Sequence, residues 1–192
     1  SSNLQGWEVP NFRLVDVHEK DHELYRTEAE AVVLFFTGTG CPIARKSSGK
    51  LKRLQRKYEA EGVQFWIINS YAEEKIKDIE REIRDLELHT MTYLRDTKQL
   101  VALSYGIDRT AEVVAIDTKS WEVFYQGAVD DQFSEGAERP KASQKFLQAA
   151  LDQFLAGEPV VESKTRAVGC RIAFEVSDRP GKELDYALDI AP

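Results

Sequence analysis

The sequence predicts an α/β fold, a mixed β-sheet flanked by helices on both faces and followed by a C-terminal tail. Three observations predict this fold: two strand patterns that each lead into a helical pattern, a pair of strand patterns joined by a turn, and a last helical pattern. In chain order these segments are residues 31–36, 43–61, 63–70, 73–86, 112–117, 121–129 and 140–155.

The first strand and helix meet at a cysteine. Residues 31–36, AVVLFF, have the length and the β-branched or aromatic content of a strand buried on both faces, as in a parallel sheet. A loop over 37–40 ends this strand and Cys41 follows. Pro42 can begin a helix, because its fixed φ suits the first turn, where its missing N–H is not needed. The apolar positions of the helix fall at i, i+3 and i+7 on one buried face and are Leu51, Leu54 and Tyr58.

The remaining early elements follow the same order. Residues 11–17 alternate like a strand, and residues 22–28 lead back toward the central strand as a hairpin partner. The strand over 63–70 begins after Gly62, which suits the end of the preceding helix. The helix over 73–86 has one apolar stripe and an acidic first turn, which suits the helix dipole.

Shorter elements complete the chain. We expect a strand over 91–94 and a helix over 97–105 that ends at Gly106. After the hairpin come a polar loop over 130–139 and a last helix that Pro140 opens.

Length and charge limit the function classes. The chain has 192 residues, which suits one domain, expected over 1–157, with an extension over 158–192 that packs on the domain or pairs in trans. Its 33 acidic and 26 basic residues give a net charge of −7, which argues against binding to nucleic acid or to an anionic membrane surface. No apolar run approaches the length of a membrane span.

Cys41 is the strongest candidate for chemistry. A thiol at a helix N-terminus lies near the positive end of the helix dipole and beside unpaired N–H groups, so its thiolate is favoured and its pKa is expected to fall. An isolated cysteine is more often an inert packing residue. The combination of strand, glycine-containing loop, Cys-Pro and helix favours the reactive interpretation. The second cysteine, Cys170, allows only one pairing, too few for a disulfide scaffold.

Several short motifs stand in a characteristic order: FFTGTGCPIA at 35–44, INS at 68–70, RTAEV at 109–113, YQGAVDDQ at 125–132 and AVGCRI at 167–172. In this order they resemble those of redoxin-domain proteins of the thioredoxin fold, similar in kind to the peroxiredoxin-like alkyl hydroperoxide reductase and thiol-specific antioxidant superfamily. The resemblance covers most of the chain and implies a thioredoxin-like sheet.

The resemblance also implies a set of site residues. Cys41 takes the place of the reactive cysteine, and Thr39 and Gly40 shape its loop. Arg109 is expected to place positive charge near the thiolate, the alternative being a solvated surface arginine. The residues expected in the chemistry are Cys41, Cys170, Thr39 and Arg109, and those expected in the substrate loops are Gly40, Pro42, Thr110, Ala111 and Glu112. Glu112 is also expected to line the rim of the site with residues 130–132.

The sequence departs from the family pattern at two places. The pattern at RTAEV has a cis proline that faces the sulfur, where this chain has Ala111. A cis bond before a residue other than proline costs about 2.5–4 kcal/mol, so we expect a trans peptide, a reshaped loop and an additional N–H group. Ala44 and Arg45 exclude the dithiol and copper-chaperone motifs, and Gly38 stands where a peroxiredoxin has threonine.

We therefore predict a thiol-based redox protein in which the Cys41 thiolate attacks a disulfide or a peroxide. Cys170 either resolves the oxidised Cys41 or is a passive tail residue, and a bridge requires their Cα atoms to lie within about 7 Å. The expected partners are a protein disulfide or peroxide substrate and an external thiol reductant, and a homodimer is a candidate assembly. We expect no cofactor and no resident metal.

Two alternatives stay open at this point. The cysteines could hold a soft metal such as copper(I), although none of the three histidines, His18, His22 and His89, has a ligand spacing with a cysteine. The chain could instead be a non-catalytic interaction domain of a larger exported protein. The sequence begins at Ser1 without methionine, which suits a removed upstream segment, and the resemblance favours a periplasmic or exported location over a cytoplasmic one.

Overall fold

Seven consecutive buried residues form β3 (Ala31–Thr37) in the computed structural model, which describes residues 8–175. Side chains alternate between its two faces: Val33 and Phe35 enter one apolar core, whereas Val32, Leu34 and Phe36 enter the other. A strand buried on both faces must have helices or loops on each side. β3 is therefore the centre of the fold, as the continuous apolar run predicts.

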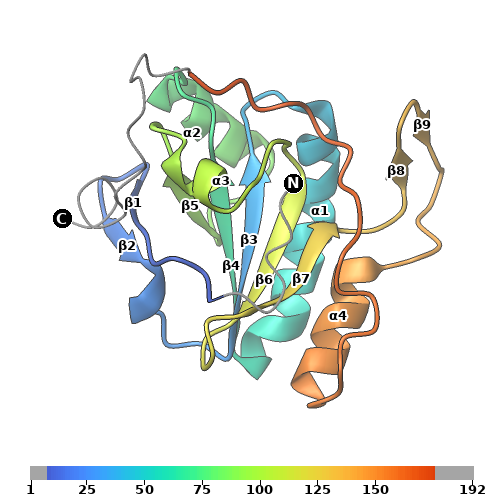
Figure 1. Cartoon of the computed structure of the whole chain (residues 1–192). Coiled ribbons are helices and arrows are strands. Elements are labelled where there is room, and N and C mark those ends of the chain that lie inside the picture. The colour runs from blue at the N-terminus through green and yellow to red at the C-terminus, as the bar shows by residue number, and fades with distance from the viewer. Residues whose placement is uncertain (1–7, 176–192) are drawn as a thin grey trace, which may run out of the picture.

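The sheet has seven strands in the order β2-β1-β5-β4-β3-β6-β7 (Figure 1). Strands β3, β4 and β5 are parallel, and the outer strands pair antiparallel. The other strands of the sheet are β1 (Arg13–Asp16), β2 (Asp21–Glu23), β4 (Val63–Asn69), β5 (Thr92–Arg95), β6 (Glu112–Asp117) and β7 (Val123–Ala128). The mixed sheet confirms the predicted fold class.

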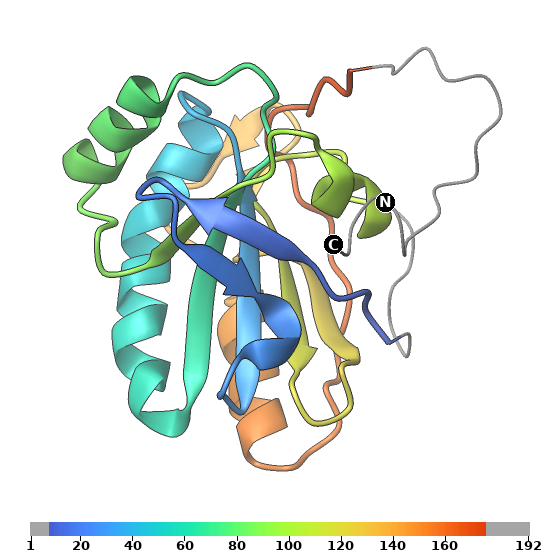
Figure 2. The same ribbon diagram turned by 90° about the vertical axis from the view of Figure 1, so that its left-hand side faces the viewer.

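Helices cover both faces of the sheet (Figure 2). One core contains residues of α1 (Pro42–Tyr58), α2 (Ile76–Asp85) and α4 (Phe146–Leu155), and the other contains residues of α3 (Leu100–Ser104). Leu51, Leu54 and Tyr58 of α1 are buried, as their spacing predicts. Two single 3₁₀ turns, η1 (Leu24–Arg26) and η2 (Glu59–Glu61), follow β2 and α1. No helix within residues 8–175 is both long and apolar enough to cross a membrane.

Three helix starts differ from the predictions. The helix predicted over 97–105 begins at Leu100, directly after Gln99, which has a φ of +58°. The last helix begins at Phe146 instead of Pro140, because the carboxylate of Asp131 accepts the N–H groups of Ser143 and Gln144 and holds that segment in a loop. The second helix begins at Ile76 instead of residue 73, because Glu74 turns inward to the loop before Cys41. The predicted polar loop over 130–139 contains a small hairpin of β8 (Phe133–Ser134) and β9 (Ala137–Glu138).

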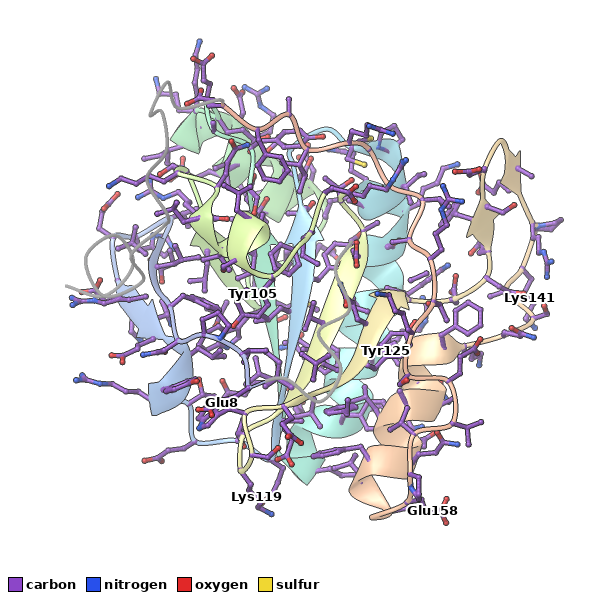
Figure 3. All side chains as sticks on the ribbon, viewed as in Figure 1. Glu8, Tyr105, Lys119, Tyr125, Lys141 and Glu158 are labelled. Atoms are coloured by element: carbon purple, nitrogen blue, oxygen red, sulfur yellow. The ribbon has the colours of Figure 1, made fainter. Side chains whose placement is uncertain are left out.

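The chain after α4 returns along the domain. We call residues 163–172 the strap. Figure 1 shows it, in orange to red, running beside β7 and past the N-terminal end of α1. Gln126 on β7 donates its N–H to the Ser163 carbonyl at 2.9 Å and accepts the Thr165 N–H at 3.0 Å. The hydroxyl of Tyr125, labelled in Figure 3, lies 2.6 Å from that of Thr165. Residues 176–192 of the predicted extension lie outside the described part of the chain.

Candidate active site

Cys41 follows the loop that leaves β3 and is the N-cap residue of α1, with Pro42 in the first turn. Its N–H donates to the Gly38 carbonyl at 3.1 Å, and Gly40 adopts a φ of +82°, which only glycine adopts without strain. The Gly40 N–H donates to Oε2 of Glu82 at 2.8 Å. The side chain of Cys41 is 3 % exposed. The loop thus aims the sulfur inward, under the cover of another segment.

That covering segment is the strap, which brings Cys170 to Cys41. Their Sγ atoms lie 2.8 Å apart, and both cysteines are free thiols in this structure. Cys170 is partly exposed, whereas Cys41 is buried. The two sulfurs are separated by 129 positions in the sequence, so the strap is what places them together. The arrangement allows a hydrogen bond between a thiol and a thiolate, or a disulfide after oxidation.

The loop opposite Cys41 contains Thr110 and Ala111. Oγ1 of Thr110 lies 3.0 Å from Sγ of Cys41, and Thr110 is fully buried. No cis peptide is present among residues 8–175, and Ala111 has a φ of +58°. Its N–H donates to the Phe36 carbonyl at 2.7 Å, so the N–H group that a proline would lack ties this loop to β3. The trans peptide before Ala111 agrees with the prediction.

The surroundings of the two sulfurs shift the pKa values of the two thiols in opposite directions. Burial opposes ionisation of Cys41, but hydrogen bonds from the Cys170 thiol, the Thr110 hydroxyl and the Ala44 N–H outweigh it, and the pKa of Cys41 is lowered. Burial raises the pKa of Cys170, and so does its position beside Cys41. Of the two thiols, Cys41 is therefore the more acidic.

Removing the Thr110 hydroxyl should make the thiolate form of Cys41 less stable relative to the thiol. We expect Thr110→Val to raise the pKa of Cys41 by about one unit or more, because a hydrogen bond to a charged group contributes about 1.5–3 kcal/mol and one unit corresponds to about 1.4 kcal/mol. The measurement is the rate of iodoacetamide alkylation of Cys41 as a function of pH. Thr92→Val, on β5, is the matched control and should leave the profile unchanged. An unchanged profile in Thr110→Val would exclude this hydroxyl as a source of acidity.

Arg109, expected to place charge near the thiolate, and Glu112, expected in a substrate loop, have other contacts. Nη1 of Arg109 donates to the Gly169 carbonyl at 3.3 Å, so this side chain holds the strap. Glu112 is 3 % exposed and its Oε1 accepts from Nε2 of Gln126 at 2.9 Å, which differs from the expectation of an exposed rim residue. The reason is that Glu112 begins β6, in the interior of the sheet. Asp130 is likewise engaged, in an ion pair with Lys50 at 2.6 Å.

Two carboxylates, a half-buried one on Glu74 and a buried one on Glu82, support the loop before Cys41, and sequence reasoning missed both. Oε1 of Glu74 accepts the Thr39 N–H at 2.6 Å, and its other oxygen accepts the Thr39 hydroxyl and the Asn69 amide. Glu82 binds Gly40 and also pairs with Arg45 at 2.9 Å. Burial raises the pKa of Glu74. Thr39 therefore acts on the loop through Glu74. One signal was available: Glu82 lies three residues after Ile79 and four before Leu86, on the buried stripe of the helix.

Tyr71 is a third residue that the sequence did not reveal. Its ring lies directly over Gly38, where a Cβ atom would come within 2.3 Å of the ring carbons. Burial, together with the negative charge of Cys170 and Cys41, raises the pKa of Tyr71 to about 12. The hydroxyl therefore stays protonated at neutral pH, beside Cys170. Because Gly38 has no side chain, the ring of Tyr71 can lie over it and come close to the two sulfurs.

Within residues 8–175, no group of three or more histidine, cysteine, aspartate or glutamate side chains could hold a metal ion. The ring of His22, one of the histidines considered for a metal, lies 3.0 Å from Oδ2 of Asp16. The thiols of Cys41 and Cys170 are the two groups that lie together beside the loop that leaves β3.

Comparisons with known proteins agree with the fold. A family model described as AhpC/TSA family matches residues 6–128. No curated protein matches the sequence. A hypothetical protein of Sinorhizobium meliloti 1021 has a similar structure, with 24 % identity and a TM-score of 0.82, covering 92 % of this chain and 98 % of that one. An uncharacterized conserved protein of Geobacillus kaustophilus has 27 % identity and a TM-score of 0.79, with coverage of 90 % and 93 %.

A third similar structure has a name that refers to thiol chemistry. It is a putative thiol:disulfide interchange protein, DsbE, of Chlorobium tepidum, with 23 % identity and a TM-score of 0.66. The match covers 80 % of this chain and 99 % of that one. At this identity the likeness shows a shared thioredoxin-like fold.

Proposed function

Because the chain belongs to the AhpC/TSA family, we propose that it is a thiol-based oxidoreductase in which Cys41 is the attacking thiolate and Cys170 the resolving thiol. The observation that carries this proposal is the distance of 2.8 Å between the two Sγ atoms, at a position where Cys41 has a lowered pKa and Cys170 a raised one. Thiol redox chemistry needs a thiolate and, for a disulfide product, a second thiol within bonding reach.

With a disulfide substrate, the Cys41 thiolate attacks one of its sulfurs and forms a mixed disulfide, and the other sulfur leaves as a thiolate. With a peroxide, the Cys41 thiolate attacks the terminal oxygen, the O–O bond breaks, and Cys41 becomes a sulfenic acid while the peroxide leaves as an alcohol or water. The peroxide step oxidises Cys41 by two electrons, whereas with a disulfide substrate the two-electron oxidation of the protein is complete only after the second exchange. The protonated hydroxyl of Tyr71 and the hydroxyl of Thr110 are the donors beside the sulfurs.

Cys170 completes either reaction. Its sulfur attacks that of Cys41, and the leaving group is the substrate thiolate in one case and water in the other. The product is a Cys41–Cys170 disulfide, which an external thiol reduces in two exchange steps. The strap provides this second thiol because Ala44 occupies the position of a neighbouring resolving cysteine.

Titration with limiting oxidant tests the proposal. The reduced protein is mixed with less than one equivalent of hydrogen peroxide or, separately, of a small aromatic disulfide, and the free thiols that remain are counted after denaturation. We expect both thiols to be lost together for every oxidant molecule consumed, because the second thiol reacts with the first within the same molecule. The faster of the two oxidants identifies the substrate class.

Two results would contradict the proposal. Loss of only one thiol per oxidant molecule, with Cys41 over-oxidised, would show that Cys170 does not act as the resolving thiol. No loss of thiols with either oxidant would remove the redox function, and would favour an interaction domain.

A further inference from the structure

The strap is paired with the loop opposite Cys41 as one strand pairs with another. The Thr110 N–H donates to the Cys170 carbonyl at 2.9 Å, and the Ile172 N–H donates to the Asp108 carbonyl at 2.9 Å. Arg109 and Arg171 form an antiparallel bridge between these two bonds. The segment 108–110 therefore presents a backbone edge beside the reactive sulfur, and the strap occupies it by strand addition.

The occupant of this edge must have a particular sequence. A Cβ atom on Gly169 would lie 1.8 Å from the Thr110 carbonyl oxygen, so the position before the cysteine has room for glycine alone. Ile172, two residues after the cysteine, is 5 % exposed and packs into the core that contains α3. The edge thus accepts an extended segment of the form Gly-Cys-x-Ile, with the cysteine directly over Cys41.

We propose that the edge over residues 108–110 is a docking site for an extended, cysteine-bearing segment of a partner protein, and that the strap is its internal occupant. The inference rests on the proposed function, since the state of the Cys41–Cys170 couple then controls the site. In the disulfide form the strap is covalently attached and the edge is closed. In the dithiol form only hydrogen bonds and the burial of small apolar side chains hold the strap, and a partner segment can displace it.

Displacement gives the reaction a direction. The partner's cysteine, oxidised in a disulfide, takes the place of Cys170, and the Cys41 thiolate attacks it; the partner's second sulfur leaves as a thiolate. Cys170 then attacks Cys41, the partner's cysteine leaves as a thiolate, and the strap returns to the edge. The partner is reduced by two electrons and the protein is oxidised by two. The oxidised form cannot rebind the partner, which releases the product.

A peptide-binding experiment tests the docking site. The probe is a fluorescent peptide with the sequence of residues 166–174 in which serine replaces the cysteine, so that binding is non-covalent, and the readout is fluorescence anisotropy. The full chain is used in the oxidised form, in the reduced form and as the reduced Gly169→Ala variant, whose added methyl group expels the strap. Gly49→Ala, within α1 and 3.7 Å from the nearest atom, is the matched control. Ile172→Ser, which removes the strap's buried anchor, is a second way of loosening the strap.

The peptide must compete with the strap for the edge over residues 108–110, and this competition determines the affinities we expect. A tethered segment acts at an effective concentration on the order of millimolar, so the peptide should bind reduced wild type and Gly49→Ala weakly. Reduced Gly169→Ala and Ile172→Ser should bind at least about tenfold more tightly, since the strap no longer competes. The oxidised protein should not bind the peptide. A peptide in which alanine replaces its glycine should bind none of the forms.

Three outcomes would overturn the inference: equal binding to the oxidised and reduced forms, no gain in either loosened variant, or equal binding of the alanine peptide. Failure of the proposed function is distinguishable, because in that case no oxidised form with a Cys41–Cys170 bond can be prepared. The two loosened variants would still test the edge itself.

Discussion

Cys41→Ser is expected to abolish thiol turnover, with the rate falling to that of the reaction without protein. A serine hydroxyl is not ionised at neutral pH, and the hydrogen bonds from Thr110 and Cys170 that favour the thiolate cannot make it a comparable nucleophile. The measurement is the steady-state rate of peroxide or disulfide reduction in the presence of an excess of a dithiol reductant. Folding is checked by circular dichroism, because Cys41 is buried.

Cys170→Ser is the matched variant, since it changes the other sulfur of the same pair. We expect it to keep the first oxidation of Cys41, seen as one thiol lost in a single turnover, but to lose most of the turnover that requires an internal disulfide. If Cys170→Ser turned over at the rate of the wild type, Cys170 would be a packing residue of the strap. If Cys41→Ser kept its activity, the reactive thiol would have been assigned to the wrong residue.

Ala111→Pro is expected to destabilise the protein by about 3 kcal/mol or more, although proline is the residue that the family pattern has at this position. Ala111 has a φ of +58°, which the proline ring cannot adopt, and its N–H donates to the Phe36 carbonyl at 2.7 Å. Loss of this bond leaves a buried carbonyl without its donor, at a further cost of about 1–3 kcal/mol. Thermal unfolding should show a decrease in Tm of roughly 6–12 °C.

Ala111→Gly is the control for this prediction. Glycine adopts a positive φ without steric cost and keeps the N–H group, so this variant should be close to the wild type in stability. Wild-type stability in Ala111→Pro would mean that the loop can adopt the proline-containing conformation, and that the positive φ is not required by the fold.

The path from β3 through Cys41 into α1 could be predicted from the sequence because each step is local. A run of apolar residues, a glycine-containing loop and a Cys-Pro start act over a few positions, and the buried face of α1 follows from helical spacing. The same holds for the hairpin of β6 and β7, whose turn lies between two strand patterns. The trans geometry of Ala111 was also predictable, since a cis bond before a residue other than proline is costly.

The parts that could not be predicted depend on contacts between distant segments. Glu74 resembles the solvent-facing acidic residues of any helix start, and its role appears only when the loop at Thr39 folds against it. The position of Glu82 on the buried stripe of the helix indicates burial, but its partner Gly40 lies on a distant segment. Arg109 was expected to act by its charge, but it lies against Gly169 because the strap passes there. The strap itself has no periodic pattern. Its position is fixed by the missing side chain at Gly169, by single backbone bonds and by isolated side-chain contacts such as that of Ile172 with the core.

Peptide mapping of the oxidised protein tests the central claim most directly. The reduced chain is treated with one equivalent of oxidant, alkylated under denaturing conditions and digested with trypsin, which places Cys41 in the peptide 27–45 and Cys170 in the peptide 167–171. The account predicts that these two peptides are recovered joined by a disulfide within a monomeric chain. Recovery of both peptides separately, each alkylated or with Cys41 oxidised alone, would contradict it.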